Sequence, residues 1–441
     1  MQNSTLKVII YPIQAWGHIN ACLGIAEVLR EREHSVTFII DSSLENYFNK
    51  FGFQEYLLYR KNSNLNTNES FIETAERYRI QFGLTTAEYH RRFHQKAFVH
   101  SKDNFDLTLE YDPQVDEALK KLEPDLFISD AYYVPGSVLK NKIPLIINWS
   151  SNPLMLYNIH DYFENQLRFP PFGSGLSTDC SSKHTWKRDI ECIHENIFKP
   201  SVELQNIIYQ KSGVSNELIA EYNNAPHIYG FPEELDYSFI SSMNNCFQID
   251  SYCRETESKV LNIPENFFNP DTETLIYLSL GTIGSIDVEL MKRICKIISQ
   301  LPYKFIICKG LYADKYSLPE NCWGDKMVPQ IDAIRKSSLT ITHGGNNTVT
   351  EALTFGKPMI VLPIFFDQFD NAQRVQEQGY GIRLDPYSFQ LKDISSAIDF
   401  LLNDPETQQR CSRIAQRMSN SNRKTKLCEW IENYCKIKQK I

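Results

Sequence analysis

The densest group of residues that could perform chemistry is the segment Thr-His-Gly-Gly-Asn-Asn-Thr-Val-Thr-Glu at positions 342–351. It follows a short apolar run and precedes a helical pattern, so its glycine pair lies where a helix begins. Glycines let a ligand approach the backbone, and the free amides of a helix N-terminus carry about half a positive charge, which suits a phosphate. A glycine turn with a purely structural role is the simpler interpretation of a glycine pair. The added donors His343, Asn347 and Thr348 favour an anion site.

A second group combines a histidine with an aspartate from a distant part of the chain. Gly17 and His18 follow the apolar run at positions 8–12, and Asp130 ends another apolar run. An imidazole has a pKa near neutrality and can take a proton from a hydroxyl, while a carboxylate can orient the ring and stabilise its cation. A lone loop histidine is more often a surface residue, and an aspartate before a helix is often an N-cap. The pair is therefore a hypothesis for a catalytic base and its partner.

Alternating strands and helices must position both groups. The first half predicts strands over residues 8–12 and 35–40, a polar turn over 14–20 and a helix over 21–32. The second half repeats this order, with a strand over 274–280, a glycine turn over 281–285, a helix over 288–301 and a strand over 305–308. Such alternation is typical of parallel sheets covered on both faces. Two facing doubly wound domains place a site in the cleft between them, at the carboxyl ends of their strands.

The same pattern predicts the domain organisation. Residues 244–249 are polar and predict the join, so we expect an N-terminal domain over 1–246 and a C-terminal domain over 247–420. Residues 421–441 carry apolar side chains at helical spacing. We expect this last segment to form a helix that packs back on the N-terminal domain.

Composition excludes several classes of protein. The chain has 441 residues, 42% hydrophobic and 23% charged, and a net charge of −8, which argues against a nucleic-acid binder. Its longest apolar runs fall short of the about 20 residues that span a membrane. The first strand begins too early to leave room for a signal peptide, and the eleven scattered cysteines include no Cys-x-x-Cys pair. We therefore expect a cytoplasmic protein, in which the glycosylation motif Asn148-Trp149-Ser150 is a chance match.

The chain resembles the family 1 UDP-dependent glycosyltransferases, which modify small lipophilic molecules. The signature of that family contains Trp-x-Pro-Gln, His-x-Gly-x-Asn-Ser/Thr, a Glu and Asp-Gln. The matching positions here are Met327, Val328, Pro329, Gln330, His343, Gly345, Asn347, Thr348, Glu351, Asp367 and Gln368. The spacing from His343 to Gln368 is kept without a gap, and several polar positions in one register make the match specific. The resemblance implies the α/β fold called GT-B, with two facing Rossmann-like domains and a cleft between them.

The resemblance also implies roles in binding the UDP-sugar. His343, Asn347 and Thr348 would hold the diphosphate, with a hydroxyl from Thr282 or Ser285, Glu351 would bind the ribose, Gln330 the nucleoside, and Asp367 and Gln368 the sugar. Gly17, Met327, Val328, Gly345 and Asn346 would complete this site. Met327 departs from the family, which has a tryptophan stacked under the uracil at that position, and methionine packs there less rigidly.

The implied reaction is an inverting sugar transfer. His18 would remove the proton of an acceptor hydroxyl, and Asp130 would orient His18. The oxygen would then attack the anomeric carbon from the face opposite UDP. We expect no metal, because the sequence lacks His-Glu-x-x-His, a cysteine cluster and, in the donor region, Asp-x-Asp.

The substrates are predicted from the same resemblance. Asp367 and Gln368 suit glucose, with galactose and glucuronic acid left open. Vertebrate-type members have a signal peptide and a C-terminal membrane span, which we expect this chain to lack, as in the bacterial and mite-type members that conjugate flavonoids, other phenolics and foreign compounds. The aromatic-rich stretches 49–111 and 157–172 are either additional core or the wall of an apolar pocket. The expected acceptor contacts are Trp16, Phe82, Tyr132, Tyr133 and Phe366.

Two alternatives belong to other classes. One is a non-catalytic homologue that binds lipophilic ligands, and the other is a UDP-sugar epimerase with the same architecture. Retention of His18, Asp130 and the Asp367-Gln368 pair favours a transferase. A nicotinamide dehydrogenase is disfavoured because the first loop lacks Gly-x-Gly-x-x-Gly. We expect a monomer that binds a UDP-sugar and a small acceptor and needs no cofactor.

Overall fold

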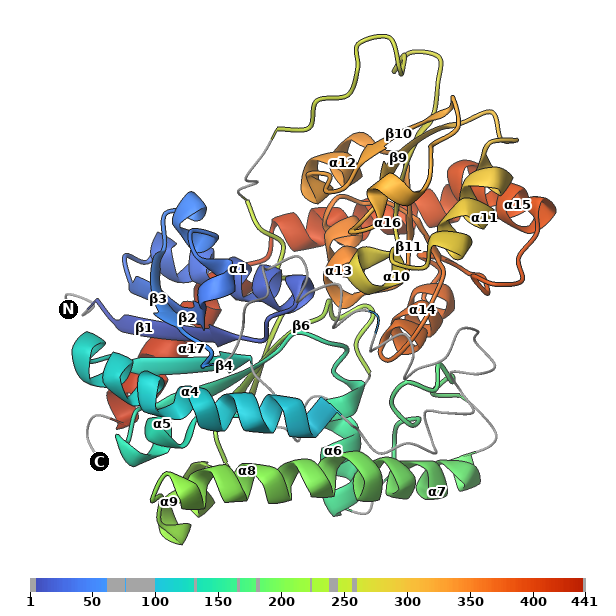
Figure 1. Cartoon of the computed structure of the whole chain (residues 1–441). Helices are drawn as coiled ribbons and strands as arrows, with labels where there is room; N and C mark the ends of the chain where they lie inside the picture. The colour runs from blue at the N-terminus through green and yellow to red at the C-terminus, as the bar shows by residue number, and fades with distance from the viewer. Residues whose placement is uncertain are drawn as a thin grey trace.

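The protein is described from a computed structural model, which covers residues 5–61, 76, 100–130, 133–164, 167–179, 183–222, 224–237, 245–255 and 260–438. Two parallel sheets, each covered by helices, form two lobes of the molecule (Figure 1). This architecture confirms the predicted α/β fold of two facing doubly wound units.

The first lobe is built on a seven-stranded sheet in the order β3-β2-β1-β4-β5-β6-β7. Its strands are β1 (Lys7–Pro12), β2 (Ser35–Asp41), β3 (Gln54–Leu58), β4 (Leu126–Asp130), β5 (Leu145–Trp149), β6 (His227–Gly230) and β7 (Cys246–Ile249). Its helices are α1 (Trp16–Glu31), α4 (His100–Leu122), α5 (Gly136–Lys140), α6 (Leu154–Glu164), α7 (Lys183–Ile193), α8 (Lys199–Lys211) and α9 (Asn216–Tyr222), with the short 3-10 helices η1 (Ser42–Leu44) and η2 (Phe48–Phe51) and the π-helix η3 (His194–Phe198).

The second lobe is built on a six-stranded sheet in the order β10-β9-β8-β11-β12-β13. Its strands are β8 (Leu275–Ser279), β9 (Lys304–Cys308), β10 (Cys322–Asp325), β11 (Leu339–Thr342), β12 (Met359–Val361) and β13 (Gly381–Arg383). Its helices are α10 (Gly281–Gly284), α11 (Val288–Ile298), α12 (Gln330–Lys336), α13 (Asn346–Thr354), α14 (Gln368–Glu377), α15 (Leu391–Asn403) and α16 (Pro405–Ser419), with a short turn η4 (Ala313–Lys315). The last helix, α17 (Arg423–Lys438), lies against α1 and β7 of the first lobe.

The strand orders place a topological switch point in each sheet. In the first sheet the order reverses between β1 and β4, and in the second between β8 and β11. The segments that leave two such strands diverge, and open α/β sheets bind ligands in the crevice between them. These are the strands that precede the candidate residues His18, Asp130, Thr282 and His343.

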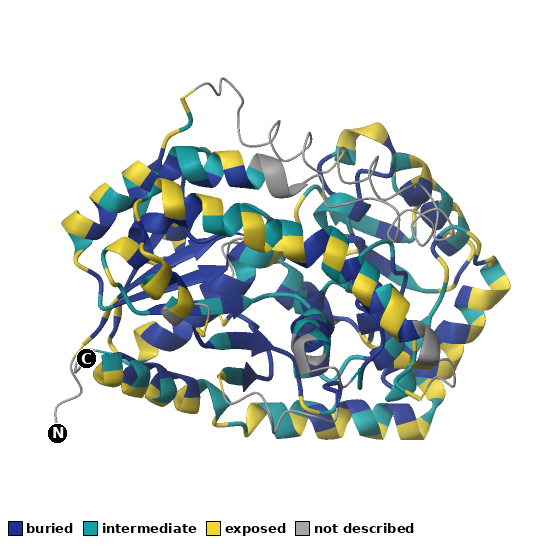
Figure 2. Ribbon diagram, turned by 90° about the horizontal axis from the view of Figure 1, so that it is seen from below, coloured by how far each residue is buried: buried dark blue, intermediate teal, exposed yellow. Residues whose placement is uncertain are grey.

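The cores explain why the strands are so apolar. All residues of β4, β8 and β11 are buried, as expected for parallel strands covered on both faces. Figure 2 shows the same contrast, with buried strands inside and exposed residues along the outer faces of the helices. The sheets are therefore rigid supports for the segments at their carboxyl ends.

Three predicted segments differ from the structure. The polar turn predicted over 14–20 is wrong from Trp16 onward, because α1 already begins there. The predicted glycine turn after β8 contains the short helix α10. The stretch predicted as a join at 244–249 contains β7, where Gln248 donates to the Phe231 carbonyl at 2.5 Å and is buried. The predicted boundary at 246/247 therefore falls within a strand of the first sheet, and the domain limits stay a prediction.

Candidate active site

One cavity of about 1550 Å³ lies between the two lobes. Its wall includes residues that follow β1, β4 and β5 of the first sheet and residues that follow β8, β11 and β12 of the second. Both switch points therefore open into the same space. The predicted residues that line it are Trp16, Gly17, His18, Asp130, Tyr133, Thr282, Met327, Val328, Gln330, His343, Gly345, Asn346, Asn347, Thr348, Phe366, Asp367 and Gln368.

His18 and Asp130 form a pair at the first switch point. His18 Nδ1 lies 2.9 Å from Asp130 Oδ2, and the side chains are 29% and 2% exposed. Because a carboxylate oxygen can only accept, Nδ1 carries the proton and Nε2 is left as the basic nitrogen. His18 lies in the first turn of α1 rather than in the predicted loop. The register of β1 and β4, in which Pro12 is opposite Asp130, brings the two segments together.

The environment of His18 raises its pKa. Burial lowers the pKa of the imidazole, but the carboxylate of Asp130, aided by Asp367, outweighs burial and favours the cation. Asp130 in turn accepts from the Ser150 hydroxyl at 2.5 Å and from the Asn148 amide at 3.2 Å. A ring that gains a proton here would be stabilised at once by a fixed, buried carboxylate.

His343 occupies the second switch point in a different environment. Its ring is flanked by glycines: a Cβ at Gly281 would lie 2.6 Å from the imidazole, and one at Gly345 would lie 2.7 Å from it. Burial lowers the pKa of His343 to about 4. The ring is therefore neutral at neutral pH and can offer a hydrogen bond without a charge.

Helix α13 begins beside His343. Its N-cap is Gly345, which has no side chain to satisfy the first amides. Asn347 Nδ2 donates to the Gly17 carbonyl at 2.7 Å and Asn346 Nδ2 to the Gly230 carbonyl at 2.8 Å. Both asparagine amides thus contact the first lobe, while the backbone at the start of the helix remains suited to an anion.

Gln330, Thr348 and Glu351 form one hydrogen-bonded group. Gln330 Nε2 donates to Glu351 Oε2 at 2.6 Å and to Thr348 Oγ1 at 3.2 Å, and the Tyr277 hydroxyl donates to Gln330 Oε1 at 3.1 Å. Glu351 is 2% exposed and does not line the cavity, whereas Met327 is 49% exposed and does. The side chains of Gln330, Thr348 and Glu351 are therefore hydrogen-bonded to one another and cannot be treated as independent.

The Asp367–Gln368 pair lies at the start of α14. Asp367 Oδ2 accepts from the Asn152 amide of the first lobe at 3.0 Å, and burial raises the pKa of Asp367 to about 6. Gln368 Oε1 accepts from the backbone amides of Ile364 and Phe365 at 3.0 and 3.1 Å. The two side chains are thus held in place by backbone groups, with both residues in the cavity wall.

Four predicted residues are not placed at the cavity, and Glu351, described above, is one of them. Ser285 is 1% exposed, donates to the Thr282 carbonyl at 3.2 Å and does not line the cavity, so of these two residues Thr282 is the one that can offer a hydroxyl there. Phe82 and Tyr132 lie outside the described residues. The other expected acceptor contacts, Trp16, Tyr133 and Phe366, line the cavity.

The end of β5 and the segment after it contain residues to which the sequence analysis gave no role at the site. Asn148 and Ser150 contact Asp130, and Asn152 contacts Asp367 and Asn371. The first two had been set aside as a chance glycosylation motif. Their position directly after the apolar residues 145–147 was the available signal, since polar residues there lie at the edge where sites form.

Two features are absent from the described residues. Among these residues, no group of three or more histidines, cysteines, aspartates or glutamates is arranged to hold a metal ion. Within the same ranges, no helix is long and apolar enough to cross a membrane.

Comparisons with known proteins agree on one family of sequences. A family model described as UDP-glucoronosyl and UDP-glucosyl transferase matches residues 190–420, more than half of the chain. NDP-glycosyltransferase YjiC of Bacillus subtilis is 24% identical over 444 residues, with 96% of each chain covered. UDP-glucuronosyltransferase 2B16 of Oryctolagus cuniculus is 30% identical over 176 residues, which cover 39% of this chain and 34% of that one.

Solved structures share the fold at low sequence identity. The spinosyn forosaminyltransferase SpnP has a TM-score of 0.69 at 16% identity, covering 98% of this chain and 100% of that one. The glycosyltransferase VinC, solved in complex with DTDP, has a TM-score of 0.65 at 14% identity, covering 99% and 100%. These likenesses extend over both lobes.

Proposed function

The chain belongs to the UDP-glucoronosyl and UDP-glucosyl transferase family, and from this premise we propose that it moves glucose from UDP-glucose to a hydroxyl of lipophilic small molecules. It is a UDP-dependent glycosyltransferase with the GT-B fold. The observation that carries the proposal is the shared cavity, which is lined by both the His18–Asp130 pair of the first lobe and the start of α13 in the second. Flavonoids, other phenolics and xenobiotics are the proposed acceptors.

His18 is the proposed base. Its Nε2 takes the proton of the acceptor hydroxyl, and Asp130 stabilises the resulting imidazolium. The acceptor oxygen forms a bond to the anomeric carbon while the bond from that carbon to the β-phosphate oxygen breaks. The leaving oxygen keeps the electron pair, so the products are UDP and a glucoside of inverted configuration.

The donor would be held by the second lobe. The amides at the start of α13, the neutral His343 and the hydroxyls of Thr282 and Thr348 would bind the diphosphate without a metal ion. Gln330 would contact the nucleoside, and the buried Glu351, which accepts from the Gln330 amide, would orient it. Met327, half exposed in the cavity wall, would pack on the uracil face.

The sugar and the acceptor would meet between the lobes. Ionised Asp367 would accept from hydroxyls of glucose, with Gln368 beside it. The side chains of Trp16, Tyr133 and Phe366 offer apolar surface to an acceptor, and Phe172 and Phe198 add to it. Apolar walls with few polar groups favour a lipophilic acceptor.

The test is acceptor-dependent release of UDP. UDP-glucose is incubated with a pooled panel of flavonols and simple phenols, with the wild type beside His18→Ala. We expect release that needs an acceptor and falls by about 10²–10⁴-fold in the variant, the usual contribution of a general base. UDP affinity, measured by calorimetry, should be the same in both proteins. Near-normal turnover in His18→Ala would remove the proposed base.

A further inference from the structure

Two residues of one segment donate hydrogen bonds to the carboxylate oxygen of Asp130 that does not contact His18. β5 pairs with β4, and Asn148 and Ser150 lie where β5 ends. Both donate to Asp130 Oδ1, Ser150 at 2.5 Å and Asn148 at 3.2 Å. The other oxygen, Oδ2, is 2.9 Å from His18 Nδ1. The carboxylate therefore presents one oxygen to neutral donors and the other to the imidazole.

The orientation of the Asn148 amide is itself fixed. The Tyr252 hydroxyl donates to Asn148 Oδ1 at 2.7 Å, which leaves Nδ2 to face Asp130. Tyr252 is 3% exposed, and its ring lies against Gly230, where a Cβ would stand 2.5 Å from the ring. The contacts form a continuous chain from a buried ring to the carboxylate, and such chains restrict one another's geometry.

The donors also suit the charge of Asp130. A buried carboxylate is stable only when hydrogen-bonded, and neutral donors stabilise it without cancelling the charge that His18 needs. Asp367 acts on His18 from the start of α14. Burial raises the pKa of Cys22 and of Tyr252 well above their usual ranges, so both stay neutral beside Asp130.

We propose that Ser150 and Asn148 are positioning residues that hold the Asp130 carboxylate with its Oδ2 aimed at His18. The proposal rests on the proposed function, in which His18 takes the proton of the acceptor. Ser150 Oγ also lies 3.2 Å from His18 Nδ1, so this hydroxyl is close to both members of the pair. Neither residue gains or loses a proton in the reaction.

The test combines a titration with kinetics. The chain has ten histidines, so an NMR spectrum of histidine-labelled protein contains few signals. The signal that is missing in His18→Gln is the signal of His18. In Ser150→Ala the carboxylate loses a donor and attracts the imidazole proton more strongly, so the pKa of His18 should rise by about half a unit. The acid limb of kcat/KM should move by the same amount, kcat should fall about tenfold, and UDP affinity should not change.

Matched variants separate positioning from packing. Ser150→Thr keeps the hydroxyl and should restore the wild-type titration. Tyr252→Phe keeps the ring but frees the Asn148 amide, and should shift the titration in the same direction as Ser150→Ala. Ser337→Ala removes a buried hydroxyl outside the cavity wall and should leave the titration in place.

The two proposals fail separately. A pKa of His18 that stays in place or falls in Ser150→Ala overturns the positioning role, even if turnover drops. A weaker affinity for UDP-glucose with an unmoved titration would make Ser150 a sugar contact, which also overturns it. A shifted titration in a chain that transfers no sugar retains the positioning role and refutes the proposed function.

Discussion

His18 and His343 line one cavity, yet their surroundings move their pKa values in opposite directions. Burial lowers the pKa of both rings, but Asp130 outweighs burial at His18, whereas burial dominates at His343 and lowers its pKa to about 4. At neutral pH one ring can accept a proton and the other is a fixed neutral donor. Titratable groups whose environments separate their pKa values are suited to different roles in one reaction.

Asp367 gives a prediction about pH. Burial raises its pKa to about 6, so the carboxylate is ionised above that value and protonated below it. Because the ionised form would accept from sugar hydroxyls under the proposed function, the affinity for UDP-glucose should rise as the pH rises through about 6. Above this pKa, Asp367→Asn should lower the affinity for UDP-glucose about tenfold, and the affinity of the variant should no longer change as the pH passes through about 6. Calorimetry on either side of the pKa measures both effects.

The ligand control for Asp367 is UDP, which lacks the sugar. At one fixed pH the wild type and Asp367→Asn should bind UDP equally. If the variant lost as much affinity for UDP as for UDP-glucose, Asp367 would act on the nucleotide instead of the sugar.

Gly281 gives a prediction about His343 that leaves the histidine in place. An added Cβ would lie 2.6 Å from the imidazole, and the backbone has φ +67°. Alanine at this position therefore strains the turn and displaces the ring. We expect Gly281→Ala to weaken UDP binding about tenfold, as measured by calorimetry.

Gly213→Ala is the matched control for Gly281→Ala. Its backbone has φ +76°, but an added Cβ meets nothing within 4 Å, and the residue is not in the cavity wall. This variant should lose about 1–2 kcal/mol of stability from backbone strain and keep its affinity for UDP. Equal UDP affinity in both variants would mean that the position of the His343 ring is unimportant.

At the scale of elements, two helix starts show what the sequence could predict. The start of α13 was predicted because glycines and asparagines directly follow an apolar strand. The start of α1 was placed too late because its N-cap is Ala15, which makes no side-chain cap, so the usual N-cap signal is absent. The motif from His343 to Gln368 was predictable because its residues are close in sequence.

Contacts between distant segments could not be predicted in the same way. The hydrogen bond from Ser150 to Asp130 depends on how β4 and β5 pair, and the contact from Asn347 to Gly17 depends on how the lobes meet. Ser285 was expected at the cavity because it follows a glycine turn. The short helix α10 instead turns its hydroxyl back to Thr282. The spacing of residues in the sequence does not show which partner a side chain faces in the folded protein.

Helix α17 gives a prediction about stability. Leu427 is fully buried between this helix and the first lobe, and Cys428 donates to the Val28 carbonyl at 3.4 Å. Leu427→Ala should cost about 2–5 kcal/mol, the usual range for a large-to-small change in a core, and lower the thermal midpoint. Ile437→Ala on the same helix, at a side chain that is 60% exposed, should change stability by less than about 0.5 kcal/mol. Similar losses in both would show that α17 is not packed on the first lobe.

At the scale of the whole molecule, the cavity depends on contacts that join the lobes. Asn347 donates to Gly17, and the amide of Asn152 donates to Asp367. The Gly173 amide donates to Asp370 of α14 at 2.6 Å. Each contact joins a segment of the first lobe to the start of a helix in the second. The distance between the base and the donor site is therefore a property of the whole chain.

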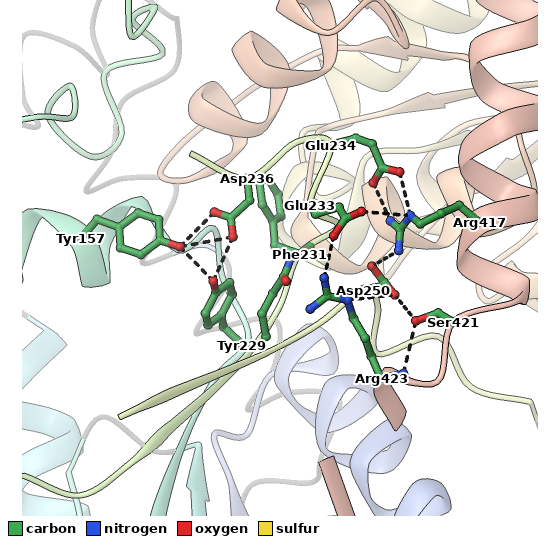
Figure 3. A network of polar contacts seen from close by, with 11 residues as sticks. Tyr157, Tyr229, Phe231, Glu233, Glu234, Asp236, Asp250, Arg417, Ser421 and Arg423 are labelled. Atoms are coloured by element: carbon green, nitrogen blue, oxygen red, sulfur yellow. Dashed lines mark hydrogen bonds and ion pairs between the residues drawn. The ribbon is translucent and has the colours of Figure 1, made fainter. Parts of the chain in front are cut away.

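Arg417 of α16 adds a contact where the chain returns toward the first lobe. It forms ion pairs at 2.5 Å with Glu234, after β6, and with Asp250, after β7 (Figure 3). The same figure shows Arg423 and Ser421 joining this network. Asp250 has a side chain that is only 8% exposed, so the loss of Arg417 leaves a nearly buried carboxylate with fewer partners.

Arg417→Ala should therefore change how the two lobes are positioned relative to each other more than it changes the proposed UDP-sugar site. We expect a loss of about 1–3 kcal/mol of stability, because part of the carboxylate's compensation is removed. kcat/KM should fall while UDP affinity is kept, since the proposed nucleotide contacts belong to the second lobe. Arg413→Ala, at an exposed residue of the same helix, should change neither quantity. If Arg417→Ala lowered the affinity for UDP as much as it lowered kcat/KM, the prediction would be wrong, because the effect would then lie in the second lobe itself.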